Sequence, residues 1–253
     1  MSDEENVYGR AEAALRRSDT AEVERVLTAK WPNLANAPGE AQHIMAMAYL
    51  AKLDGARAVQ FMRAAVRAEP KSLRHHIALG HILSSSGDHA GAADAYAAAA
   101  QIDPNWPGVH FVLSVASYKA GRHAEAETAA RAAVQANPIA ETWDALASAM
   151  RALGNGQEAL AASDEALKLD RDDINAINGR GAALLMLNRP GEALEVFESL
   201  FAKGVNAPVL ALNRAAAYDL LGRTNEARAI YDDAQRRWAH LPNLQQQIAA
   251  RRR

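Results

Sequence analysis

The chain has 253 residues, enough for one or two domains with a buried core, and 49% of them are hydrophobic, with alanine supplying much of that share. A formal net charge of −2 excludes strong attraction to nucleic acid or to an anionic membrane. The absence of cysteine excludes disulfides, thiolate metal sites and cysteine nucleophiles.

Helices are expected almost throughout, because alanine is the strongest helix former and no stretch alternates as a half-buried strand does. The first pair is predicted within residues 4–38, with Ser18-Asp19-Thr20 as its turn and Val23 and Leu27 as packing residues. The acidic, polar start MSDEENVYGR predicts no secretory signal, and no apolar run reaches about 18 residues. We therefore expect a cytoplasmic protein with no membrane insertion.

A fixed period begins after this first pair. Pro70, Pro104 and Pro138 are spaced 34 residues apart. An alanine lies twelve residues before each proline, and alanines continue the series further along the chain at spacings of 33 or 34: Ala58, Ala92, Ala126, Ala159, Ala193 and Ala227. Low-complexity sequence would have no such phase, so the period indicates a structural repeat.

Each period divides into two amphipathic halves. In the most regular unit the first half runs from about Leu73 to Ser85 and the second from His89 to Gln101. Ser86-Gly87-Asp88 between them is a turn signal, and Asp103-Pro104 ends the second half because proline cannot continue a helix interior. The period is therefore predicted to be helix–turn–helix.

These residues resemble the tetratricopeptide repeat, a 34-residue unit with small and large side chains in fixed places. Leu79-Gly80 match its seventh and eighth places, Gly181 repeats the glycine, and Tyr96 and Phe197 stand at its twenty-fourth. The resemblance implies an all-α fold, a right-handed superhelix (α-solenoid) of about six to seven repeats spanning residues 1–241, with a capping helix and basic tail at 242–253. The repeats are expected at about 4–38, 39–72, 73–106, 107–139, 140–173, 174–207 and 208–241.

The resemblance also implies a concave groove lined by the first helix of each pair. Groove positions transferred from the family, together with an asparagine from its inner-face track, give His43, Met47, Ile77, His81, Phe111, Val115, Tyr118, Asp144, Ser148, Arg151, Asn178 and Asn213. The centre, with Phe111, Val115 and Tyr118, is apolar and aromatic, although Phe111 and Val115 could instead pack between adjacent helices. The lysine–asparagine pair with which some members hold a C-terminal carboxylate is absent.

Motifs of catalysis and metal binding are not found. The eight histidines form no HExxH motif and no set of three ligands, and His76 fits a packing position of the repeat. Neither a GxxxxGK[ST] loop nor a GxSxG turn occurs. We expect no metal, no cofactor and no enzyme activity.

Three functions stay open at this point. The first is an adaptor that binds a peptide or helix of another protein in its groove. The alternative is a recruiting or regulatory module of a bacterial sulfotransferase, glycosyltransferase or envelope-assembly system, to whose repeats this alanine- and arginine-rich sequence is similar. Self-association through an end repeat or the groove is the third.

Overall fold

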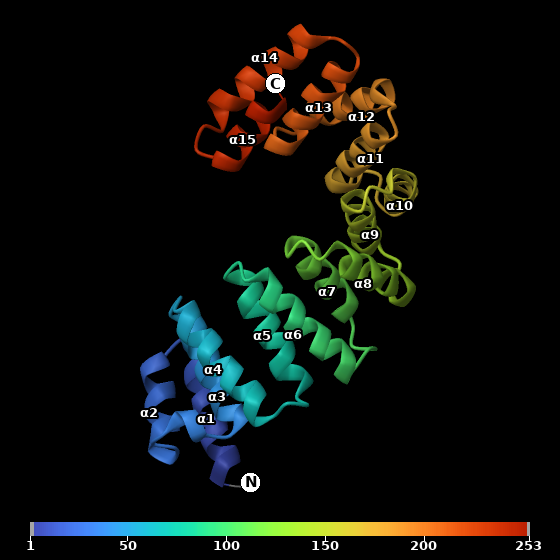
Figure 1. Cartoon of the computed structure of the whole chain (residues 1–253). Helices are drawn as coiled ribbons and strands as arrows, with labels where there is room; N and C mark the ends of the chain where they lie inside the picture. The colour runs from blue at the N-terminus through green and yellow to red at the C-terminus, as the bar shows by residue number, and fades with distance from the viewer. Residues whose placement is uncertain (1–2, 252–253) are drawn as a thin grey trace. The chain divides into compact units, whose positions relative to one another are not determined.

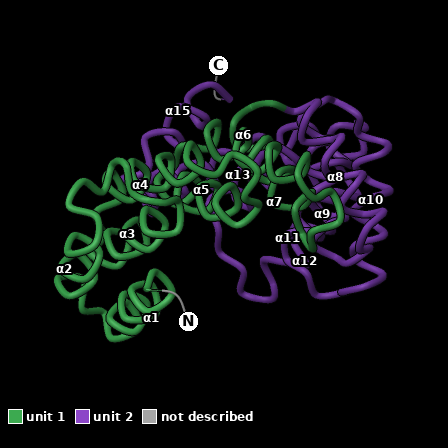
Figure 2. Tube along the Cα trace, turned by 90° about the horizontal axis from the view of Figure 1, so that it is seen from below, with its two compact units in different colours: residues 1–122 green, residues 123–253 purple. Residues whose placement is uncertain are grey.

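The computed structural model describes residues 3–251, and every regular element in that range is a helix (Figure 1). The chain divides into two compact units, residues 1–122 and 123–253, which Figure 2 distinguishes by colour. Each unit is described by itself below. The predicted all-α solenoid of helix pairs is confirmed.

Within residues 3–122, the first unit contains seven α-helices and one short 3₁₀ helix. They are α1 (Asp3–Arg16), α2 (Thr20–Lys30), η1 (Leu34–Asn36), α3 (Gly39–Ala51), α4 (Gly55–Ala68), α5 (Leu73–Ser85), α6 (His89–Ile102) and α7 (Val109–Lys119). Consecutive helices pack as hairpins, α1 with α2, α3 with α4 and α5 with α6, and each hairpin also contacts the next (Figure 1). Neighbouring repeats therefore share one continuous core, as expected of units that cannot bury their apolar face alone.

The described part of the second unit, residues 123–251, contains eight helices. They are α8 (His123–Ala136), α9 (Ala140–Ala152), α10 (Gly156–Leu169), α11 (Ile174–Met186), α12 (Pro190–Ala202), α13 (Pro208–Leu220), α14 (Thr224–Arg237) and α15 (Pro242–Arg251). Helix α15 packs on α13 and α14, burying Leu244 and Ile248. It covers the apolar face that the last pair would otherwise leave in solvent.

Caps at the helix N-termini explain why the turns fall where they do. Asp19, Asp54 and Asp88 each accept a hydrogen bond from a backbone N–H in the first turn of α2, α4 and α6. Such a cap satisfies a donor that has no partner inside the helix. The turn Ser86-Gly87-Asp88 thus ends α5 and starts α6, with Gly87 at φ 83°.

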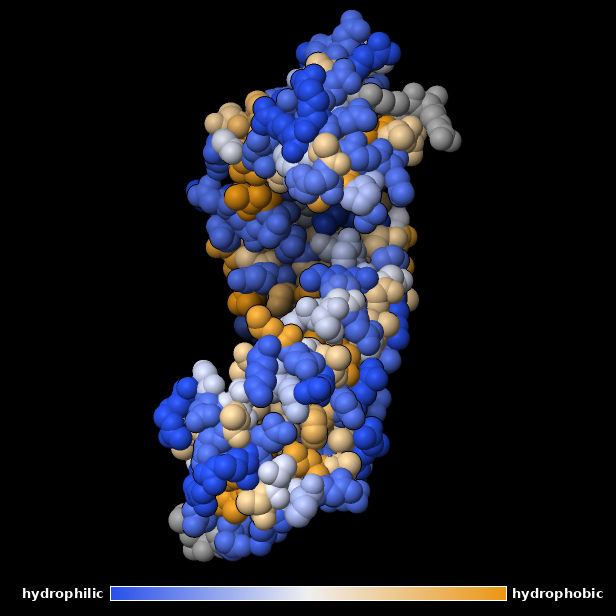
Figure 3. All heavy atoms as spheres, turned by 90° about the vertical axis from the view of Figure 1, so that its left-hand side faces the viewer, coloured by the Kyte–Doolittle hydropathy of each residue, from blue (hydrophilic) through white to orange (hydrophobic). Residues whose placement is uncertain are grey.

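Alanine makes the close packing of the pairs possible. The periodic alanines are fully buried, as Ala58, Ala92 and Ala126 show in successive hairpins. Larger rings fill the space beside them, for example Tyr96 and Phe197. On the face drawn in Figure 3, hydrophilic residues predominate and the apolar ones form small separate groups.

Candidate functional site

A pocket of about 400 Å³ opens between α3 and α5 in the first unit. We call it the α3–α5 pocket; it is lined by His43, Met47, Leu50, Leu73, Arg74, Ile77, Ala78, His81, Ile82 and Trp106. Pockets that bind organic groups are typically mostly apolar, with a few placed polar groups, and this one has that composition. Four of the residues predicted to face the groove, His43, Met47, Ile77 and His81, are among the lining.

Helical spacing brings these side chains to one place. His43, Met47 and Leu50 follow one another at four and three residues on α3, and Leu73, Ile77 and His81 do so at four on α5. Residues at these intervals share one face of a helix. Two facing rows therefore make the two walls of the pocket.

Trp106 contributes to the pocket from the loop before α7, at a position that the repeat spacing does not select. The loop folds back through hydrogen bonds from the Trp106 N–H to the Asp103 carbonyl (3.3 Å) and from the Val109 N–H to the Trp106 carbonyl (3.1 Å). Gly108 turns the chain into α7 at φ 82°. A ring at the end of a repeat reaches the groove only through this loop geometry, which helical periodicity does not describe.

His43 is the buried polar group of the pocket. It is 6% exposed, and neither nitrogen of its ring makes a hydrogen bond with another residue of the described chain. Burial, with a smaller effect from the charge of Arg74, lowers the pKa of His43 to about 4, so the ring is neutral at pH 7. A neutral imidazole carries one donor and one acceptor, and the unpartnered Nδ1 is itself buried, which leaves Nε2 as the nitrogen that a ligand could reach.

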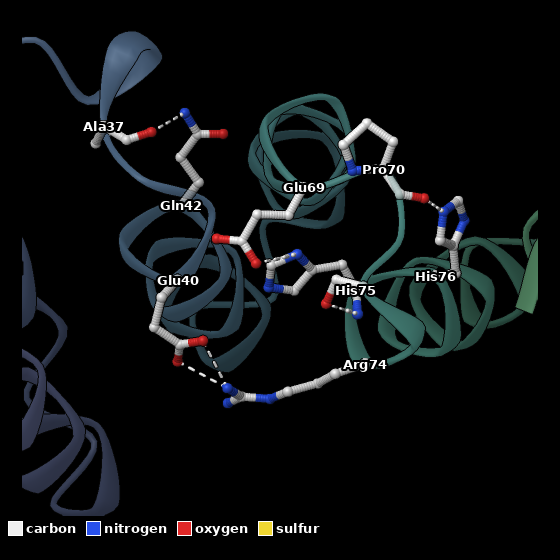
Figure 4. Close-up of polar contacts among 9 residues, drawn as sticks. Ala37, Glu40, Gln42, Glu69, Pro70, Arg74, His75 and His76 are labelled. Atoms are coloured by element: carbon white, nitrogen blue, oxygen red, sulfur yellow. Dashed lines mark hydrogen bonds and ion pairs between the residues drawn. The ribbon is translucent and has the colours of Figure 1, made fainter. Parts of the chain in front are cut away.

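A second imidazole lies behind the first. The His75 ring is 5.2 Å from the His43 ring, centre to centre, and is 1% exposed. Its Nδ1 lies 3.8 Å from a carboxylate oxygen of Glu69 (Figure 4), and burial lowers the pKa of His75 as well. The expected packing role of His76 belongs to His75, one residue earlier in the helix; His76 Nε2 lies 3.0 Å from the Pro70 carbonyl oxygen.

Arg74 is the one residue of the pocket lining with a permanent charge. Its Nη1 donates to both carboxylate oxygens of Glu40, at 2.8 and 2.7 Å (Figure 4). The side chain is 56% exposed, and its Nε and Nη2 donate to no other residue in the range 3–251. Arg74 therefore keeps donor hydrogens for a ligand at the pocket.

His81 is fixed by its neighbour across the hairpin. Its Nδ1 lies 3.0 Å from the Tyr96 hydroxyl, and the two rings meet edge to face. The predicted groove residues of α7 lie outside the pocket lining: Phe111 and Val115 are partly buried, and Tyr118 is 40% exposed. Whether they contact a ligand stays a prediction.

The predicted groove residues of the second unit are polar and lie on α9, α11 and α13. Arg151 Nη2 donates to the Ser148 hydroxyl at 2.8 Å, and its guanidinium lies against the Cα of Gly179, where a side chain would collide with it. Asn213 Nδ2 donates to Asn178 Oδ1 at 3.1 Å, linking α13 to α11. The two asparagines of the expected track are therefore bonded to each other.

Asp144 begins this polar row on α9. It is largely buried, and its Oδ1 has no hydrogen-bond partner. Burial raises the pKa of Asp144, while the positive charge of Arg151 acts against the increase. The second unit therefore offers an unused acceptor beside a positioned guanidinium.

Among residues 3–251, no group of three or more histidine, aspartate or glutamate side chains is placed to hold a metal ion. The longest helices of the same range have 14 residues, whereas crossing a bilayer takes about 20 apolar residues, and none qualifies as a membrane span.

Comparisons with known proteins agree with the fold. Two sequence models of the tetratricopeptide repeat match the chain, at residues 45–108 and 83–150. No curated protein sequence matches it.

Solved structures of the same fold are similar over most of the chain. A tetratricopeptide repeat protein from Parabacteroides merdae is 13% identical, with a TM-score of 0.69 over 97% of both chains. PilF from Pseudomonas aeruginosa is 18% identical, with a TM-score of 0.60 over 84% of this chain and 97% of that one. MamA from Desulfovibrio magneticus is 18% identical, with a TM-score of 0.59 over 65% of this chain and 93% of that one. Repeat period, helix pairing and these matches agree: residues 45–150 match tetratricopeptide repeats in sequence, and the chain has the fold of a tetratricopeptide repeat protein.

Proposed function

We propose that the protein is a non-catalytic scaffold that binds a segment of another protein, with the α3–α5 pocket as the main anchor. The observation that supports this most is the pocket itself. It joins predicted groove residues from two repeats into one apolar recess with a buried, unpartnered imidazole at its wall. Recesses that accept one anchoring side chain commonly carry much of the affinity of a protein interface.

The other predicted groove residues have auxiliary roles in this proposal, each within its own unit. Phe111, Val115 and Tyr118 would extend the apolar surface of the first unit along α7. Asp144, Ser148, Arg151, Asn178 and Asn213 would offer hydrogen-bonding groups on the second unit. Apolar and polar groups of these kinds suit a peptide or an amphipathic helix.

Partner capture with a matched pair of variants tests the proposal. Ile77→Asp places a charge in the pocket wall, whereas Ile174→Asp makes the same change at a 50% exposed site in the first turn of α11. An acidic residue is favourable near a helix N-terminus, so the control should keep its fold. We expect proteins retained from a lysate by the wild type and by Ile174→Asp to be lost with Ile77→Asp.

Two measurements complete the test. Circular dichroism must show equal helicity for both variants, so that loss of capture is not loss of fold. If Ile77→Asp, folded, retains the same proteins as the wild type, the pocket is not the binding site. Phe111→Ala combined with Tyr118→Ala tests the α7 extension in the same assay and should weaken capture.

A further inference from the structure

The pocket selects its occupant through three features that act together: its size, its unpartnered imidazole and the charge at its mouth. From these we infer that the α3–α5 pocket binds a tyrosine side chain of a partner segment, with an acidic residue next to that tyrosine. This inference rests on the proposed function and adds the chemistry of the bound residue.

The pocket has room for a ring, and its wall chemistry favours one. A volume of about 400 Å³ is near the lower end of the range for pockets that bind organic groups, which is roughly 300–1,000 Å³. The wall combines the rings of Trp106, His43 and His81 with the sulfur of Met47. Aromatic and thioether groups make favourable contacts with the face and edge of another ring.

The imidazole of His43 discriminates between aliphatic, aromatic, charged and phenolic side chains. An aliphatic or phenylalanine side chain would cover His43 without offering its Nε2 a hydrogen bond, which is unfavourable for a buried polar group. A carboxylate or ammonium would have to give up its hydration in an apolar recess. A phenol hydroxyl both donates and accepts, so it pairs with the neutral imidazole in either tautomer.

Arg74 supplies the second contact. It carries the only permanent charge of the pocket lining, and its Nε and Nη2 are left open by the ion pair with Glu40. A carboxylate on the residue beside the bound tyrosine would pair with these two N–H groups. The charge at the mouth therefore complements an acidic residue and not a basic one.

Three blocked dipeptides test both contacts. The probes are acetyl-Tyr-Glu-amide, acetyl-Phe-Glu-amide and acetyl-Tyr-Gln-amide, titrated into the full ¹⁵N-labelled chain and followed by NMR. We expect saturable shifts of the Met47 and Ile77 amides and of the Trp106 indole N–H. The Tyr-Glu probe should bind about five-fold or more tightly than each of the other two, the size of one hydrogen bond or one exposed ion pair.

Two variants assign each preference to its residue. His43→Phe should remove the preference for tyrosine over phenylalanine, and Arg74→Gln the preference for glutamate over glutamine. Each variant should keep the other preference, which also shows that the pocket is still folded. A merely structural role of either residue would weaken all three probes alike.

The outcomes separate this inference from the proposed function. Equal saturable binding of all three probes to the wild type would overturn the tyrosine–acid inference while leaving the pocket as an anchor. No saturable shift at Met47, Ile77 or Trp106 with any probe would overturn both. A preference for tyrosine that survives His43→Phe would remove His43 from the recognition.

Discussion

Gly80 on α5 lies directly against the ring of Tyr96 on α6, so that a Cβ at residue 80 would overlap the ring. The same relationship recurs between Gly181 and Phe197 three hairpins later, in the second unit. Glycine at the eighth place of the repeat and a large ring at the twenty-fourth are thus one packing feature. This pair fixes how closely the two helices of a hairpin approach.

Gly80→Ala is expected to destabilise the protein for this reason. Overpacking typically lowers the free energy of unfolding by about 1–3 kcal/mol, whereas the better helix propensity of alanine raises it by about 1 kcal/mol. Tyr96 cannot move away freely, because its hydroxyl is bonded to His81. We expect urea denaturation to show a lower free energy of unfolding, by about 1–2 kcal/mol.

Gly191→Ala is the matched control on α12. No atom lies within 4 Å of the Cβ that this substitution adds. Its free energy of unfolding should stay the same or rise by up to about 1 kcal/mol. Equal effects of the two substitutions would show that the contact with the ring is not what requires glycine.

Ala92→Leu tests the periodic alanine of the same hairpin. Ala92 is 0% exposed, and three added carbon atoms have no space there. We expect a loss of about 1–3 kcal/mol in thermal or urea unfolding. Ala97→Leu, at a partly buried site of the same helix, should cost clearly less, and similar losses at both sites would contradict the assigned phase.

The helices were predictable because the repeat signals are local. A turn of small and polar residues lies within a few residues of each helix end, and the first and second halves predicted for the 73–106 unit end within one residue of α5 and α6. The aspartate caps and the glycines with positive φ supply the physical reason. The division into two compact units depends on packing across the whole chain and has no comparable local signal.

The candidate site was predictable only in its helical part. Spacing on α3 and α5 selects His43, Met47, Ile77 and His81, and the structure brings them to one pocket. Trp106 depends on the fold of a loop, and the unpartnered state of His43 depends on what surrounds it in three dimensions. Neither property is encoded in the identity of a residue at a repeat position.

Leu53 is a departure from the turn pattern. It has φ 60° in the turn between α3 and α4, where the corresponding turns have Gly87, Gly121 and Gly154 at φ 76–83°. The left-handed region costs a residue with a Cβ about 1–2 kcal/mol. Because the Leu53 side chain is 93% exposed, no burial of apolar surface offsets this cost.

Leu53→Gly should therefore raise the thermal midpoint, even though glycine adds freedom to the unfolded chain. The expected net gain is about 0.5–1 kcal/mol. Asn188→Gly, at φ 55° in the turn before α12, is the control and should gain less, because asparagine tolerates this region. A thermal midpoint that falls with Leu53→Gly would show that the leucine makes a stabilising contact.

Acid should destabilise the fold through His43 and His75. Burial lowers the pKa of both, to about 4 for His43, so the unfolded chain binds more protons than the folded one below the ordinary pKa of 6.5. Stability is therefore fully present above pH 6.5 and is lost as the pH falls toward 4. From the value for His43, the free energies of unfolding from urea denaturation at pH 7.5 and pH 5 should differ by about 1–2 kcal/mol.

His43→Phe separates this effect from other titrations. The charged groups around the pair are Glu40, Glu69 and Arg74. The two carboxylates favour the charged imidazole of His75 and so reduce the amount by which burial lowers its pKa. Carboxylates with a lowered pKa, such as Asp172 beside Lys203, act only below about pH 4 and do not enter this window. The variant should show a smaller change between pH 7.5 and pH 5 than the wild type, and an unchanged difference would mean that His43 does not control the acid sensitivity.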